Sequence, residues 1–133
     1  MSLAQLAEER YVSLTTFRKD GTPVSTPVWV AGDEEGRLLV WTAAESWKVK
    51  RIRRDHHVRV APCTGLGKER GDAIEAQAEI VPDVDLVQEL EQRKYGWQSH
   101  LFGALTAAMR WIRRQPPPES VTLVITEPGT NGR

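Results

Sequence analysis

The sequence has very little cysteine and no excess charge of either sign. Its single cysteine, Cys63, excludes an internal disulfide and gives no thiolate spacing for a metal site. Because 18 basic residues balance 18 acidic ones, the chain lacks the basic surplus with which proteins usually bind nucleic acid. No apolar run approaches the ~18 residues of a membrane span, and no signal peptide is visible. We therefore expect a soluble, cytoplasmic protein, for which membrane binding is not indicated.

The length and composition fit one small domain. Residues 1–133 are expected to form a single unit, with an N-terminal helix over residues 1–9 and a loose tail at 128–133. Hydrophobic residues make up 40% of the chain, which is enough for a real core. A domain of this size leaves much surface exposed, so pairing with a second copy would help to cover it.

Six short segments have the period-2 pattern of β-strands. Asp20-Gly21 lies between the first two segments and is typical of a tight hairpin turn. Pro27, within the second segment, removes one backbone donor and predicts an edge strand or a bulge. The predicted strands cover residues 11–17, 24–30, 37–42, 58–63, 73–81 and 120–126.

Three segments before or between these strands have helical periodicity. Helices are predicted at residues 2–9, 46–55 and 83–95, and in the last of these Val84, Val87, Leu90 and Glu91 share helical spacing. A further amphipathic stretch at residues 101–114 either packs on the protein or lies on a membrane surface. Strands that outnumber helices predict a mainly β fold with flanking helices, a barrel with helices packed outside it.

The helix that follows Ser46 carries an unusual charge pattern. Residues 47–54 contain five cations and no acid, although a helix N-terminus is itself electropositive. A bound anion would make this arrangement favourable, because Ser46, Lys48 and the free backbone N–H groups would all point at it. Lys48 and Arg51 lie on one face, and Thr42 precedes the loop. The alternative is a solvated basic face.

A resemblance to a known family supports the anion site. The segment 42–48 resembles the phosphate-binding segment of the pyridoxamine 5′-phosphate oxidase-like split barrels, and the wider pattern is similar to their deazaflavin branch, which uses coenzyme F420. The matching pieces, in the family's order, are residues 11–17, 19–21, 23–30, 48–53, 58–63 and 93–96. Residues 103–119 match nothing in the family.

The resemblance implies a six-stranded split β-barrel of the FMN-binding type, a homodimer paired through the sheet, with two cofactors at the interface. Thr42, Ser46, Lys48 and Arg51 would hold the phosphate. Residues 26–29 would run beside the cofactor ring, and residues 61–63 would approach it from the neighbouring strand. The implied cofactor-binding residues are Thr26, Pro27, Val28, Trp29, Thr42, Ser46, Trp47, Lys48, Val49, Arg51, Ala61, Pro62 and Cys63.

One departure from the family pattern concerns the choice of cofactor. FMN-binding members usually have arginine at the position of Trp47, so one phosphate cation is missing. This favours coenzyme F420 over FMN. Lys50 and Arg54 would then contact the acidic tail of F420.

The resemblance implies an F420-dependent oxidoreductase that transfers a hydride to an electron-poor small molecule, with no catalytic residue identified. The alternatives are an FMN-dependent oxidase or reductase, a non-catalytic F420 carrier and, more distantly, a nucleic-acid binder that uses residues 48–54.

We interpret the histidines and the cysteine as structural residues rather than as metal ligands or a catalytic nucleophile. His56 and His57 are adjacent and would face opposite ways on a strand, and His100 is distant in sequence, so no metal site is predicted. Cys63 has no neighbouring base in the sequence. We interpret it as a small buried side chain rather than a nucleophile.

Five tryptophans are many for a chain of this length. Trp29 is the candidate for contact with the cofactor ring, and Trp41 is predicted to lie in the core. Trp97 and Trp111 either flank a substrate pocket or pack a helix on the barrel, and the sequence does not separate these roles.

Overall fold

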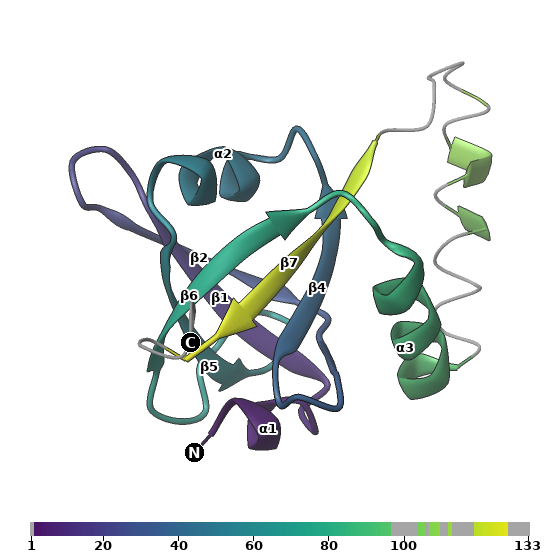
Figure 1. The fold of residues 1–133 in the computed structure, drawn as a ribbon, viewed down its shortest axis with the longest axis horizontal. Helices are drawn as coiled ribbons and strands as arrows, with labels where there is room; N and C mark the ends of the chain where they lie inside the picture. The colour runs from purple at the N-terminus through teal and green to yellow at the C-terminus, as the bar shows by residue number, and fades with distance from the viewer. Residues whose placement is uncertain (1, 97–103, 106, 110–111, 113–118, 128–133) are drawn as a thin grey trace.

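The structure is a computed structural model that describes residues 2–96, 104–105, 107–109, 112 and 119–127 (Figure 1). The tail at 128–133 lies outside the described residues, as do Trp97, His100 and Trp111. Most of the predicted amphipathic stretch at 101–114 is also outside them. No helix within the described part of the chain has the length and apolar character to cross a membrane.

Seven antiparallel strands form one curled sheet in the order β2-β1-β5-β6-β7-β4-β3. The last strand in the sequence, β7, lies inside the sheet between β6 and β4, whereas β2 and β3 lie at its edges. The strands are β1 (Tyr11–Phe17), β2 (Pro23–Val28), β3 (Ala31–Gly32), β4 (Leu38–Ala43), β5 (His57–Cys63), β6 (Ile74–Val81) and β7 (Ser120–Thr126).

The mainly β split-barrel fold is confirmed, but the predicted count of six strands is wrong. The additional strand is β3, which has two residues and pairs with Leu38 and Leu39 of β4. Two residues cannot show a period-2 pattern, and a small Ala-Gly pair gives no burial signal. The sequence therefore does not reveal this strand.

Among residues 2–96, three helices flank the sheet, at the positions that the sequence indicates. α2 (Trp47–Arg54) covers one end of the barrel and α1 (Leu3–Leu6) lies at the other, while α3 (Asp85–Tyr95) packs beside β3 and β4 (Figure 1). Helix α1 is shorter than predicted. Ser2 caps it as expected, but residues 8 and 9 bond three residues back and tighten the chain into a turn.

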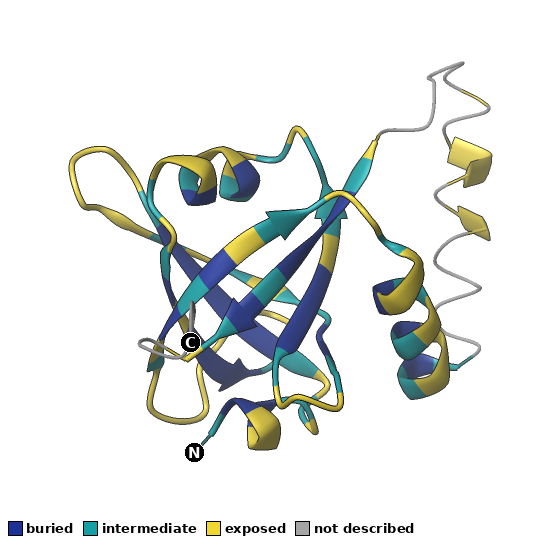
Figure 2. Ribbon diagram, in the orientation of Figure 1, coloured by how far each residue is buried: buried dark blue, intermediate teal, exposed yellow. Residues whose placement is uncertain are grey.

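The core lies inside the curl of the sheet, where alternate residues of each strand meet (Figure 2). Trp41 was predicted to belong to it, and this prediction is wrong, because Trp41 is 43% exposed. On β4 the core positions are Leu38 and Val40, so the alternation of side chains places Trp41 on the outer face.

Several local signals in the sequence are confirmed. Gly21 has a φ of 87°, which glycine adopts easily, and its N–H donates to the Arg18 carbonyl at 2.9 Å. Pro27 lies on the edge strand β2, where a missing backbone donor costs little. Both residues therefore act as their types predict.

Helix α3 is fastened to the barrel by its last two residues. The ammonium of Lys94 donates hydrogen bonds to the carbonyls of Ala7, Glu9 and Val30. The Tyr95 hydroxyl donates to the Arg10 carbonyl at 2.7 Å. These contacts join α3 to the chain just after α1 and just after β2.

Candidate functional site

The N-terminus of α2 has the geometry expected of an anion site. Ser46 is the N-cap in an extended conformation, and its Oγ accepts a hydrogen bond from the Val49 N–H at 3.4 Å. The N–H groups of Trp47 and Lys48 have no partner within the helix, because the first turn has no preceding carbonyls. Val49 itself is fully buried, so only its backbone faces this end. Thr42, half-buried on β4, lies four residues before the cap.

The cations of α2 have no counter-charge in the ranges that the structure describes. None of the five forms an ion pair with an acidic residue in the described part of the chain, and the first turn contains no acid. Partial burial, with the nearby charge of Arg51 as a second cause, lowers the pKa of Lys48. A phosphate placed between these two side chains would remove the repulsion and compensate the burial.

Two arginines connect α2 to the end of β1. Arg51 Nη1 donates to the Thr16 hydroxyl at 3.4 Å, and Arg54 donates to the Phe17 carbonyl. These contacts are not visible in the sequence, since 35 and 37 residues separate the partners. Arg54 is therefore partly occupied with a structural bond, which weakens its predicted role toward a cofactor tail.

Trp47 and Lys50 face solvent together. The indole of Trp47 is 70% exposed, and the Lys50 ammonium lies 4.6 Å from the centre of its ring, a cation–π distance. The contact holds Lys50 against Trp47. Lys48, in contrast, is partly buried and lies near the charge of Arg51.

The predicted ring-contacting residues are brought onto neighbouring strands. Strand β1 lies between β2 and β5, and Ser13 pairs with both Pro27 and Ala61, so these two flank it on one face. Side chains alternate between the two faces along each strand. Cys63 therefore lies on the same face as Ala61, whereas Thr26, Val28 and Pro62 lie on the opposite face. The predicted set is thus assembled, but over both faces of the sheet.

Trp29 is partly buried and Cys63 is fully buried. The Trp29 ring stacks on the Tyr95 ring of α3, with centroids 4.3 Å apart and an interplanar angle of 11°. Cys63 is 2% exposed, which confirms the prediction of a small buried side chain, and burial raises the pKa of its thiol. A raised thiol pKa disfavours the thiolate that a nucleophile would need.

The sheet has two edges that no described strand covers. β2 pairs only with β1, and β3 covers β4 only over Leu38 and Leu39. Backbone groups along residues 23–28 and beyond Leu39 are thus open to other partners. The free edge of β2 belongs to the segment that the resemblance in the sequence predicts beside the cofactor ring.

Glu91, a buried acid of α3, contacts the open edge of β4. Its carboxylate accepts a hydrogen bond from the backbone N–H of Trp41 on the open edge of β4, yet its Oε1 has no hydrogen-bond partner among the described residues. The side chain is 4% exposed. Burial raises the pKa of Glu91 to about 8, against the opposing effects of Lys94 and the Trp41 N–H. The sequence indicates the helical position of Glu91 but not its burial.

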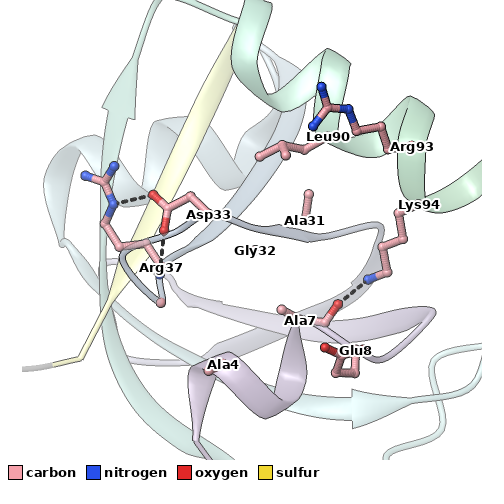
Figure 3. A pocket seen from close by; sticks show the side chains of 11 residues that line it. Ala4, Ala7, Glu8, Ala31, Gly32, Asp33, Arg37, Leu90, Arg93 and Lys94 are labelled. Carbon is pink, nitrogen blue, oxygen red and sulfur yellow. Dashed lines mark hydrogen bonds and ion pairs between the residues drawn. The ribbon is translucent and has the colours of Figure 1, made fainter.

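A cavity of about 460 Å³ lies at the other end of the molecule, between α1, β3 and α3 (Figure 3). Its walls include the small residues Ala4, Ala7 and Ala31. Most of the charges around it have partners, because Lys94 donates to backbone carbonyls and Arg37 pairs with Asp33 at 2.6 Å. The cavity contains none of the predicted cofactor-binding residues.

The two described histidines point to different partners. His56 Nδ1 lies 2.9 Å from the Ala78 carbonyl, and His57 Nε2 lies 3.0 Å from the Glu75 carboxylate. Across the residues that the structure describes, no three His, Cys, Asp or Glu side chains gather closely enough to hold a metal ion.

Comparison with known families places this geometry in context. The family model described as pyridoxamine 5′-phosphate oxidase matches residues 2–124 of the chain. This match includes the whole of the sheet up to Val124 and all of α2. No curated protein matches the chain.

Solved structures share the fold at low sequence identity. A conserved hypothetical protein from Mycobacterium tuberculosis has a TM-score of 0.62 and 23% identity, covering 96% of this chain and 81% of its own. A structure named F420 reductase has a TM-score of 0.55 and 22% identity, with coverages of 91% and 89%. An FMN-binding protein related to pyridoxamine 5′-phosphate oxidase, from Nostoc punctiforme, has a TM-score of 0.55 and 16% identity, with coverages of 92% and 74%.

Proposed function

Because the chain belongs to the pyridoxamine 5′-phosphate oxidase family, we propose that it binds a phosphorylated flavin-type cofactor at the N-terminus of α2 and is an F420-dependent oxidoreductase. The observation that carries this proposal is the set of five α2 cations without an acidic partner among the described residues. In a chain with equal numbers of acids and bases, such a local excess of positive charge favours the binding of an anionic ligand.

The residues present fit a phosphate. Ser46, the first-turn N–H groups, Lys48 and Arg51 together offer hydroxyl, amide, ammonium and guanidinium donors, the types that bind phosphate oxygens. Thr42 adds a hydroxyl from the end of β4. When bound, the reduced deazaflavin would supply a hydride from C5 to an electron-poor small molecule. The chain's own part is to hold the phosphate, orient the ring along the free edge of β2 and exclude water.

Coenzyme F420 is favoured over FMN by the surroundings of the phosphate site. Trp47 places an exposed indole where an arginine would add a second cation for FMN. Lys50, held over that indole, adds an exposed charge beyond the phosphate, where only a cofactor with an acidic tail extends. Exposed contacts of this kind contribute about 0.2–1 kcal/mol each and are weakened by salt.

We also propose that the protein is a homodimer whose interface contributes to the cofactor site. Large apolar side chains on the outside support this, since Trp41, Leu105, Met109 and Ile112 are 43 to 71% exposed. Exposed apolar area of this extent is usually covered by a partner.

The test of the cofactor is a fluorescence titration with FMN and with coenzyme F420 at low and high salt. F420 is expected to bind more tightly at low salt, with the difference narrowing as salt rises, and Trp47→Arg should shift the preference toward FMN. If FMN binds the wild-type protein as well as F420 at every salt concentration, an FMN-dependent oxidase or reductase replaces the F420 assignment. Hydride transfer to an acceptor separates an enzyme from a carrier of the cofactor.

A further inference from the structure

Thr16 is a hydroxyl at a position where the sheet otherwise places aliphatic side chains. It lies near the end of β1, is 2% exposed and shares its face with Val12 and Leu14, both core residues. Filling this space does not require a hydroxyl, since valine is β-branched like threonine. A buried hydroxyl instead needs a hydrogen-bond partner. Among the described side chains, the one that bonds to Thr16 Oγ1 is Arg51, at 3.4 Å.

Arg51 in turn has few other constraints. Arg51 is partly buried, forms no ion pair with a described acid and lies one helical turn beyond Lys48, another cation. Left to itself, a long cationic side chain beside a like charge would swing away into solvent. The bond from Nη1 to Thr16 opposes this and fixes the direction of the planar guanidinium.

We infer that Thr16 is a positioning residue of the phosphate site, because its hydroxyl holds the Arg51 guanidinium beside Lys48 before the anion arrives. This inference rests on the proposed function, in which Lys48 and Arg51 bind a phosphate. Binding to a preset pair of cations avoids the entropy of ordering Arg51 at the moment of binding. Thr16 acts through Arg51 and does not touch the ligand itself.

The experiment compares Thr16→Val, Thr16→Ser and the control Thr15→Val. Thr15 is the neighbouring buried threonine of β1, whose hydroxyl bonds to Ser25 at 2.7 Å on the other face. Dissociation constants are measured for coenzyme F420, FMN and inorganic pyrophosphate, which has no ring. Thr16→Val should raise all three by about three- to ten-fold, the usual effect of one hydrogen bond. Thr16→Ser should restore binding, and Thr15→Val should leave it unchanged.

A double-variant cycle separates positioning from general damage to the fold. In an Arg51→Ala background, Thr16→Val should have no further effect, since the residue through which it acts is gone. Equal weakening by Thr16→Val with and without Arg51, or no weakening at all, would overturn the inference. If pyrophosphate binds with the predicted pattern but neither F420 nor FMN binds, the proposed function fails while the role of Thr16 stands. If the wild-type protein binds none of the three, both fail.

Discussion

Replacing Glu91 by glutamine should stabilise the protein increasingly as the pH rises. Folding buries this carboxyl with one oxygen unpartnered and raises its pKa from the ordinary 4.5 to about 8. Between these two values the unfolded chain releases the proton while the folded chain keeps it, so the folded state loses stability as the pH rises. Glutamine carries no charge in either state, and its amide oxygen can still accept the Trp41 N–H.

The size of the effect follows from the shift. Each pH unit between about 5 and 8 costs the wild-type protein about 1.4 kcal/mol relative to the glutamine variant. At pH 7, the cost corresponds to roughly 3 kcal/mol, a large part of a typical folding free energy. Above pH 8 the folded protein also releases the proton, and the difference levels off.

The assay is urea unfolding followed by tryptophan fluorescence at pH 5, 6, 7 and 8, at one fixed protein concentration. Glu89→Gln is the matched control, because Glu89 is an exposed carboxylate of the same helix that pairs with Arg93. Its effect on the free energy of unfolding should be small, because it lies on the surface. A Glu91→Gln difference that stays constant from pH 5 to 8 would show that Glu91 is not held protonated by burial.

Three further predictions concern binding, assembly and packing. Lys48→Ala should weaken binding of FMN and F420 by about ten-fold or more, since a charge-assisted contact contributes roughly 1.5–3 kcal/mol. Lys50→Ala should weaken binding much less. Equal affinities of wild type and Lys48→Ala in fluorescence titrations would refute the site. Sedimentation at micromolar concentration should give about twice the mass of the chain, and a strict monomer with full cofactor affinity would exclude an interface site. Gly32→Ala should destabilise the fold by about 1–3 kcal/mol, because its Cβ would lie 2.6 Å from Ala7 Cβ, and Ala7→Gly should recover part of the loss in thermal melts.

The parts of the fold that follow from local chemistry are visible in the sequence. Gly21 permits the turn conformation, Pro27 tolerates only an edge, and Ser46 caps the helix that follows it. Each signal depends on a single residue type whose backbone or side chain has few alternatives. Trp41 shows the limit of such reasoning. Alternation gives two faces, but in the run Leu38–Trp41 both faces are apolar, so the pattern does not tell which one is buried.

The contacts that complete the candidate site lie beyond the reach of the sequence. Thr16 and Arg51 are 35 residues apart, and nothing local marks their bond. The spacing of Glu91 fits a helix, but its pairing with the open edge of β4 requires the whole sheet to be assembled. The cation pattern of α2 was readable because charge near a helix N-terminus has a direct physical meaning. The sequence does not show how the strands of the candidate site lie relative to α2.

The central place of β7 determines when the sheet can be completed during synthesis. β7 pairs with β6 on one side and with β4 on the other, although about 80 residues of chain lie between Leu38–Ala43 and Ser120–Thr126. Until residue 126 has left the ribosome, β4 and β6 both keep an open edge, which invites pairing with other chains. Pairing over such a sequence distance is also slow. The nascent chain therefore depends on protection of these two edges until its last strand is available.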